Sequence, residues 1–144
     1  IASLAAAAAA EDGAVAGLDA ERMRTHGLGQ NALFEVWVAQ QKNAPLVGHA
    51  IITKSYDVRR GCASIVLCEL YIAPEHRRGG LARRLMSAVA QRARDLSARE
   101  LMITTGVENA VAQRFFSAIG AKRQEAAVFM MSADGIEWLA AEGL

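Results

Sequence analysis

Apolar and polar residues alternate with a period of two over much of the first half of this chain. This period is typical of β-strands that are buried on one face. It predicts three strands, at residues 33–40, 46–56 and 62–72. Turn sequences at 42–45 and 57–61 separate them, as in a meander of hairpins. Gly48 interrupts the second strand, and we expect a weak point or a bulge there.

The second half of the chain alternates helical and strand-like patterns. Residues 80–97 carry apolar side chains every three or four positions, which predicts an amphipathic helix. The patterns that follow predict a strand at 100–105, a helix from Asn109 to Gly120, a strand at 122–132 and a C-terminal helix through 141. Asp134 and Glu137 would form the capping box of that last helix. The fold class expected from this order is α/β.

The residues before the first strand favour two helices. Residues 2–10 are almost all alanine, so we expect a helix that stops near Gly13. A short polar helix follows at 19–26, with Asp19 suited to its N-cap and Gly27 to the position after its end.

Length, composition and charge restrict the class of protein. A chain of 144 residues, 53% hydrophobic and 22% charged, is typical of one globular domain. The net charge of +1 gives no overall field to attract nucleic acid or a membrane. We therefore expect neither partner, and we find no apolar run long enough to span a bilayer.

The two cysteines give a second restriction. Cys62 and Cys68 fall in one predicted strand, where about 20 Å of extended chain separates them, too far for a disulfide. They also lack the spacing of metal ligands, so we expect no metal site. Two reduced, buried thiols are typical of a cytoplasmic protein.

The candidate chemistry lies where Pro74 stops the strand at 62–72 and an arginine–glycine turn opens the helix at 80–97. The backbone N–H groups from Arg78 to Arg83 would lack partners at the helix start, and the helix dipole favours an anion there. Such a turn suits a phosphate or pyrophosphate. An ordinary turn with a solvated arginine face explains this segment equally well.

Two motifs favour the first interpretation. The motif Arg77-x-x-Gly80-x-Ala82 is similar to the Arg/Gln-x-x-Gly-x-Gly/Ala signature of the GNAT acetyltransferase superfamily. Downstream, Asn109-x-x-Ala112-x-x-Phe115-Phe116-x-x-x-Gly120-Ala121 resembles the second signature of that family. The resemblance covers roughly residues 14–142 and is weakest before Leu33. Within the superfamily, the chain also resembles the branch that acetylates polyamines and other small amines, but this resemblance is looser.

The resemblance implies a fold and a cofactor. We expect a single GNAT-like domain over residues 1–144, with a mixed, mostly antiparallel sheet splayed at its centre and helices on both faces. The family's first strand is not recognisable here, so one interpretation is that the chain starts inside the fold. Acetyl-CoA would lie where Leu70–Ile72 and Leu101–Thr105 splay apart.

The resemblance also assigns cofactor-binding residues. Backbone groups of Leu70 and Ile72 would pair with the pantetheine arm, and an N–H near Ile72 would polarise the thioester carbonyl. Asn109 and Phe116 belong to the second motif, Asn109 beside the pantetheine arm or positioning its helix. The pyrophosphate would be held by the loop residues Arg77, Arg78, Gly79, Gly80, Leu81, Ala82 and Arg83.

In the implied mechanism, a neutral amine attacks the thioester directly. Glu69 is the candidate base, directly or through water, although a solvated strand carboxylate or an anchor for the substrate ammonium fits the position too. Phe116 occupies the position that commonly holds the acid, a tyrosine. Tyr71 or water would serve instead, or the thiolate would leave unassisted. His49 lies in mid-strand, where we expect packing rather than catalysis.

The expected function is therefore an N-acetyltransferase that moves an acetyl group from acetyl-CoA to a primary amine of a small molecule or a protein. The alternative is a non-catalytic acyl-CoA-binding module of the same fold, since Phe116 removes the usual acid. Dimers are frequent in the family, so a homodimer is an expected state.

Overall fold

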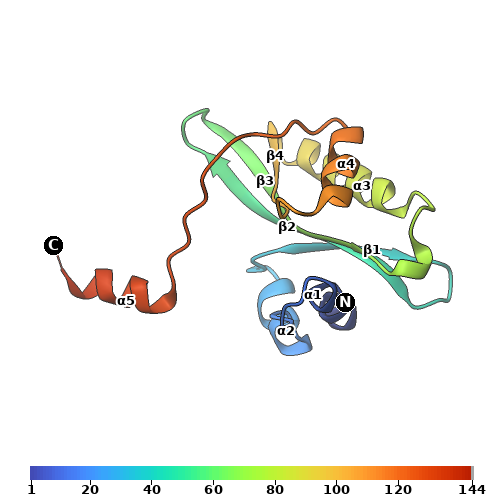
Figure 1. The fold of residues 1–144 in the computed structure, drawn as a ribbon, viewed down its shortest axis with the longest axis horizontal. Coiled ribbons are helices and arrows are strands. Elements are labelled where there is room, and N and C mark those ends of the chain that lie inside the picture. The colour runs from blue at the N-terminus through green and yellow to red at the C-terminus, as the bar shows by residue number, and fades with distance from the viewer. Residues whose placement is uncertain (144) are drawn as a thin grey trace. The chain divides into compact units, whose positions relative to one another are not determined.

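The computed structural model describes residues 1–143 and falls into two compact units. The first is Ile1–Val107 and the second is Glu108–Leu144. Figure 1 shows the elements of both units. The single GNAT-like domain over residues 1–144 stays a prediction.

The first unit is built around a mixed, mostly antiparallel sheet of four strands in the order β1-β2-β3-β4. Strands β1 to β3 form an antiparallel meander, and β4 pairs with β3 in parallel. The bounds agree closely with the expected strands: β1 Glu35–Gln40, β2 Leu46–Asp57, β3 Cys62–Ile72 and β4 Glu100–Ile103. The expected α/β class and mixed sheet are confirmed.

Helices cover both faces of this sheet, as expected (Figure 1). Helices α1 (Ala2–Glu11) and α2 (Ala20–Gly27) lie on one face and α3 (Leu81–Asp95) on the other. The apolar stripe of α3 is buried through Leu85, Met86 and Val89, while α1 buries only small alanines. The Asp19 carboxylate accepts a hydrogen bond from the Arg22 N–H, which confirms the predicted N-cap of α2.

The sheet has two irregular positions, and one of them lies beside Gly48, as expected. Gly48 pairs regularly with Ile72, and a Cβ built on it would lie 2.7 Å from the Tyr71 carbonyl oxygen. Close approach of β3 requires glycine there. The register between β1 and β2 also shifts beside it, since Ala39 pairs with Gly48 but Gln40 pairs with Leu46. The second shift, between Ile51 and Ile52, leaves Cys68 as an extra residue in β3. Cys62 is buried, but Cys68 at this bulge is exposed, so the expectation of two buried thiols is wrong for Cys68.

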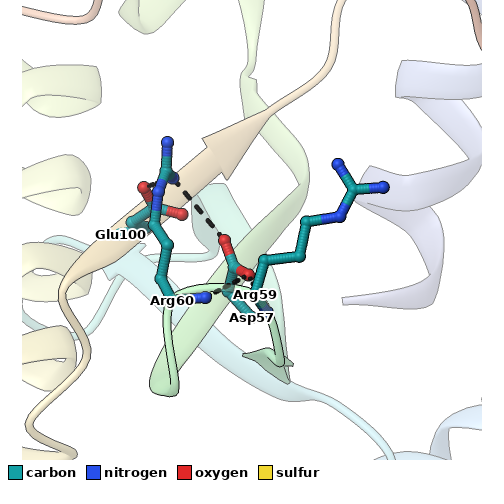
Figure 2. Close-up of polar contacts among 4 residues, drawn as sticks. All are labelled: Asp57, Arg59, Arg60 and Glu100. Atoms are coloured by element: carbon teal, nitrogen blue, oxygen red, sulfur yellow. Dashed lines mark hydrogen bonds and ion pairs between the residues drawn. The ribbon is translucent and has the colours of Figure 1, made fainter.

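A polar cluster ties the β2–β3 turn to the start of β4. Asp57 accepts hydrogen bonds from the backbone N–H groups of Arg59, at 2.9 Å, and Arg60, at 3.1 Å. The Arg60 side chain forms ion pairs with Asp57 and with Glu100 at the first position of β4 (Figure 2). This cluster lies where β4 begins to pair with β3, at Ser64 opposite Glu100.

The second unit contains α4 (Ala110–Ala118) and α5 (Ala133–Ala141). The expected strand at 122–132 is wrong, because the described residues 121–132 have no regular structure. A strand needs a hydrogen-bonded partner, and within this unit no other strand is described. The cap of α5 is Ser132, whose hydroxyl accepts from the Gly135 N–H at 3.2 Å, and not the expected Asp134–Glu137 box.

Among the helices described for residues 1–143, none combines the length and the apolar character that crossing a bilayer would need.

Candidate active site

The site begins where the sheet splays. Pairing between β3 and β4 ends at Leu67 opposite Ile103, while β3 continues to Ile72. The Ala73 N–H donates to the Val47 carbonyl at 2.9 Å, on the β2 side. Because backbone groups alternate in direction along a strand, the N–H groups of Leu70 and Ile72 point to the opposite, open edge. The expected splay at the centre of the sheet is confirmed.

The turn after β3 presents a row of backbone donors beside this edge. A short 3-10 helix, η1 (Pro74–His76), leads to Gly80, the N-cap of α3. Gly80 has φ +79° and Arg78 has φ +63°, both in the left-handed region. In the part of the chain that the structure describes, the six N–H groups from Arg78 to Arg83 donate no hydrogen bond to protein. They are free to receive an anion.

Arg77 precedes these donors, and its side chain is already bound to protein. Its Nη2 lies 2.7 Å from both carboxylate oxygens of Glu11, at the end of α1. Its Nε donates to the Ile72 carbonyl at 2.8 Å, and its guanidinium lies 5.6 Å from the centre of the Tyr71 ring. Arg77 therefore joins β3, α1 and the turn, and its role as a pyrophosphate ligand stays a prediction.

Glu11 also accepts a hydrogen bond from the Tyr71 hydroxyl, at 3.1 Å. Hydrogen bonds from Arg77 and Tyr71 hold the pKa of Glu11 below its usual range. Burial of Tyr71, together with its bond to the Glu11 carboxylate, raises the pKa of the phenol. At neutral pH the carboxylate is therefore charged and the phenol keeps its proton.

Glu69 lies two residues before Tyr71 and contacts His49 of β2. The His49 Nε2 and the Glu69 Oε1 form a hydrogen-bonded pair. His49 is fully buried, whereas the Glu69 side chain is 34% exposed. The rings of His49 and Tyr71 are 6.0 Å apart, so Glu69 and Tyr71 share a face of β3, as expected. The carboxylate thus has one oxygen bound to a buried ring, on a side chain that is partly exposed to solvent.

The bulge in β3 determines this arrangement. Leu67 pairs with Ile52, but Glu69 pairs with Ile51 because Cys68 is the extra residue. In a strand without a bulge, Leu67 and Glu69 would point to the same face. The inserted residue instead turns Glu69 to the face of the sheet that α1 covers.

A pocket of about 390 Å³ opens beside the turn. It lies between η1, the start of α3 and the turn that joins β1 to β2. Its residues are Gln40, Gln41, Val47, Glu75, His76, Arg77, Gly79, Leu81 and Arg84. Gly79 and Leu81 belong to the row of free backbone donors, so part of that row faces a concave surface.

The two remaining candidates lie in the second unit. The Asn109 side chain accepts from the Ala112 N–H at 3.0 Å and caps α4, as one of its expected roles requires. The Phe115 and Phe116 rings meet edge to face at 5.4 Å. Their contact with a cofactor stays a prediction. Among the described residues there is no group of three histidine, cysteine or acidic side chains that could hold a metal ion.

Comparison with known proteins decides the family. The model of the acetyltransferase (GNAT) family matches residues 10–121. This chain belongs to the GNAT family. GNAT acetyltransferases use acetyl-CoA as the acetyl donor, and the match includes the splayed edge, the turn and the residues of α4.

Named relatives of this GNAT chain acetylate amines. The thialysine N-epsilon-acetyltransferase of Bos taurus is 28% identical over 109 residues, which are 71% of this chain and 64% of the relative. The aminoglycoside N(6')-acetyltransferase type 1 of Salmonella typhimurium is 29% identical over 86 residues, 58% of this chain and 59% of the relative. The chain thus spans less than two thirds of the length of these two curated relatives.

A solved structure shows the same fold. Aminoglycoside N-acetyltransferase AAC(6')-Iy in complex with coenzyme A superposes with a TM-score of 0.63 at 24% identity. The match covers 72% of this chain and 78% of that one. At this identity the likeness supports the fold and not the substrate.

Sequence reasoning missed two partners in the site. Glu11 is not among the residues that the sequence pattern singles out, and for His49 the pattern predicts packing rather than catalysis. His49 is indeed packed, since it is fully buried, but it also contacts the candidate base Glu69. A mid-strand histidine is a rare residue on a buried face, and this was the available signal.

Proposed function

We propose that this protein transfers the acetyl group of acetyl-CoA to a primary amine. The observation that carries the proposal is the row of six unpartnered N–H groups, from Arg78 to Arg83, beside the open edge of β3. Backbone donors at a helix N-terminus suit a diphosphate, and an open strand edge suits the amide-bearing pantetheine arm. This chain would therefore offer places for two chemically different parts of coenzyme A.

The residues proposed to bind the cofactor divide between these two places. Backbone groups of Leu70 and Ile72 would receive the pantetheine arm, through N–H groups that already point to the open edge. The Ile72 carbonyl accepts a hydrogen bond from Arg77, so the Ile72 N–H is the backbone group left for the ligand. Acetyl-CoA supplies an activated thioester. The pyrophosphate would be held by Arg78, Gly79, Gly80, Leu81, Ala82 and Arg83, with Arg77 positioning the turn.

Glu69 is the proposed general base. Its carboxylate lies on the strand that borders the proposed thioester position, and it is partly exposed, so a proton from an ammonium group can reach it directly or through water. An N–H near Ile72 is the proposed donor to the carbonyl. One strand would thus supply both the base that takes the ammonium proton and the donor that polarises the thioester carbonyl.

Tyr71 is the proposed acid within the first unit. Its raised pKa keeps the proton that an acid must give at neutral pH. To release that proton toward a thiolate, the hydroxyl would have to leave Glu11. Water, or unassisted departure of the thiolate, is the alternative, since the thiolate is a fair leaving group.

The test of this function is an assay of the whole chain. Purified protein is given acetyl-CoA with polyamines, amino acids, aminoglycosides and peptides, and free thiol is followed with each amine. Calorimetry with coenzyme A is measured in parallel. We expect heat with coenzyme A and thiol release with at least one amine class. Absence of heat with coenzyme A would contradict the proposal at its first step.

The second candidate function is a non-catalytic acyl-CoA-binding module. Phe116 favours it, since phenylalanine at that position has no proton to give. Binding of coenzyme A without thiol release across the whole panel would support this candidate over the first.

A further inference from the structure

We infer that His49 is a positioning residue for Glu69, a neutral imidazole whose Nε2–H holds one carboxylate oxygen and leaves the other for the substrate proton. This inference rests on the proposed function, in which Glu69 is the base. It concerns a residue on a different strand, 20 positions away in sequence.

The environment of His49 determines which nitrogen carries the proton. The side chain is fully buried, and its Nδ1 has no hydrogen-bond partner among the described residues. A buried N–H without an acceptor is rare and costly, so Nδ1 is best left as a bare nitrogen. Nε2 faces the Glu69 carboxylate, which can only accept when ionised. These facts assign the Nε2–H tautomer, with Nε2 donating to Glu69.

The same facts argue against two other roles for the ring. A proton relay would pass through Nδ1, which has no described partner to receive or supply a proton. A charged imidazolium would place a second N–H in the same buried position without an acceptor. What the ring can supply is one fixed donor at one fixed place.

A fixed donor matters because the Glu69 side chain is partly exposed and would otherwise have more than one rotamer open to it. The bulge at Cys68 turns the carboxylate toward the α1 face, where His49 is the cross-strand neighbour of Tyr71. With Oε1 bound to Nε2, the rotamer of Glu69 is fixed and Oε2 is the oxygen that remains for a proton. Misplacing a catalytic group by about 1 Å can cost about 100-fold in rate.

The first experiment compares His49→Gln with His49→Leu. The glutamine amide can place an N–H close to the position of Nε2, whereas leucine fills the space without a donor. We expect His49→Leu to lower kcat about 10- to 100-fold with little change in the KM for acetyl-CoA. His49→Gln is expected to keep kcat within about 5-fold of wild type, since only a donor is needed. The same two changes at the exposed His26 are the matched controls.

Two results of this comparison would overturn the inference. If His49→Gln is as slow as His49→Leu while both remain folded, the reaction needs an imidazole and not simply a donor. If His49→Leu has the kcat of wild type, the ring has no part in positioning Glu69.

The second experiment tests whether His49 acts through Glu69. In a Glu69→Gln background the base is absent, so adding His49→Leu is expected to cause little further loss of kcat. A purely structural role would lower kcat by the same factor in both backgrounds. If the losses of kcat from the two substitutions multiply in the double variant, the inference is contradicted even if each single variant is slow.

The third measurement does not depend on activity or on a variant that folds. Nitrogen-15 chemical shifts of the His49 ring in the wild-type protein distinguish a bare ring nitrogen from a protonated one. We expect a bare Nδ1 and a protonated Nε2. A protonated Nδ1 would overturn the assignment.

These outcomes separate failure of the inference from failure of the proposed function. A wild-type protein that releases no thiol with any amine contradicts the function, and the nitrogen-15 shifts still decide the state of His49. An active wild type with an equally active Glu69→Gln variant contradicts the base assignment, and with it any positioning through Glu69.

Discussion

Arg77 and Glu11, 66 residues apart in sequence, form a two-pronged ion pair, with Nη2 of Arg77 2.7 Å from each carboxylate oxygen. The pair connects the end of α1 to the turn that carries the free backbone donors. Arg77 is also bonded to the Ile72 carbonyl, so the contact extends to the open edge of β3. The alanine-rich helix thereby contributes to the shape of the proposed cofactor site.

The first prediction concerns this pair. Glu11→Gln removes the charge that holds Arg77, so the turn loses one of its supports. Because both side chains are partly exposed, we expect a modest effect, a rise of about 2- to 5-fold in the Kd for coenzyme A. Calorimetry measures it, with Glu21→Gln on α2 as the control. A lower Kd would show that Glu11 competes with the pyrophosphate for Arg77.

The second prediction concerns Gly80, whose φ of +79° strains any other residue. Gly80→Ala is expected to cost about 1 kcal/mol of stability and to weaken coenzyme A binding, since the added methyl group stands beside the free donors. Gly61→Ala is the matched control. Gly61 also has a positive φ, +63°, and open space around it, but it lies in the β2–β3 turn. Equal losses of binding in the two variants, measured by calorimetry, would contradict a role for the turn.

Much of the fold could be predicted from local pattern. Alternation gave the bounds of β3, and the apolar stripe gave α3, because burial on one face leaves a period in the sequence itself. The strand expected at 122–132 failed for the opposite reason. Apolar β-formers favour a strand, but a strand also needs a partner, and no local pattern reports one.

The site was less predictable, because its contacts join distant residues. The turn from Arg78 to Arg83 is continuous in sequence, and its free donors follow from helix geometry alone. The pairing of His49 with Glu69 depends on a bulge that inserts Cys68, and one residue of register decides which face Glu69 takes. The sequence contains each residue of the pair but not the register that joins them.

The third prediction is a pH dependence of stability. Hydrogen bonds from Arg92 and Lys54 lower the pKa of Glu35 to about 2, from an ordinary 4.5. Because the folded-state pKa is lowered, this contribution is present above about pH 4.5 and is lost as the pH falls toward 2. With the Glu35 side chain 26% exposed, we expect about 1–2 kcal/mol at pH 7 after allowance for solvent screening.

Urea unfolding at pH 7 and pH 3 measures this contribution. The difference in unfolding free energy between wild type and Glu35→Gln is expected to be smaller at pH 3. Glu125→Gln, for which the structure shows no ion pair, is the control. A difference that stays constant between the two pH values would show that the Glu35 charge does not contribute as described.

The fourth prediction tests Tyr71 as the acid. Tyr71→Phe removes the hydroxyl that binds Glu11 and is expected to lower kcat by about 10-fold or more. Tyr56→Phe, at an exposed tyrosine of β2, removes a hydroxyl without touching this network. If kcat for Tyr71→Phe stays within about 2-fold of wild type, water or unassisted departure of the thiolate is the better account.

The last prediction concerns Phe116, which the sequence resemblance aligns with the position where the family commonly has an acid tyrosine. Phe116→Tyr restores a hydroxyl and is expected to raise kcat if supply of a proton limits the rate. The gain is expected to be larger in the Tyr71→Phe background than in the wild-type chain, because there no tyrosine competes for the role. Thiol release under saturating acetyl-CoA measures both. If Phe116→Tyr leaves kcat unchanged in both the wild-type chain and the Tyr71→Phe variant, proton supply does not limit turnover. The missing tyrosine then gives no support to a non-catalytic function.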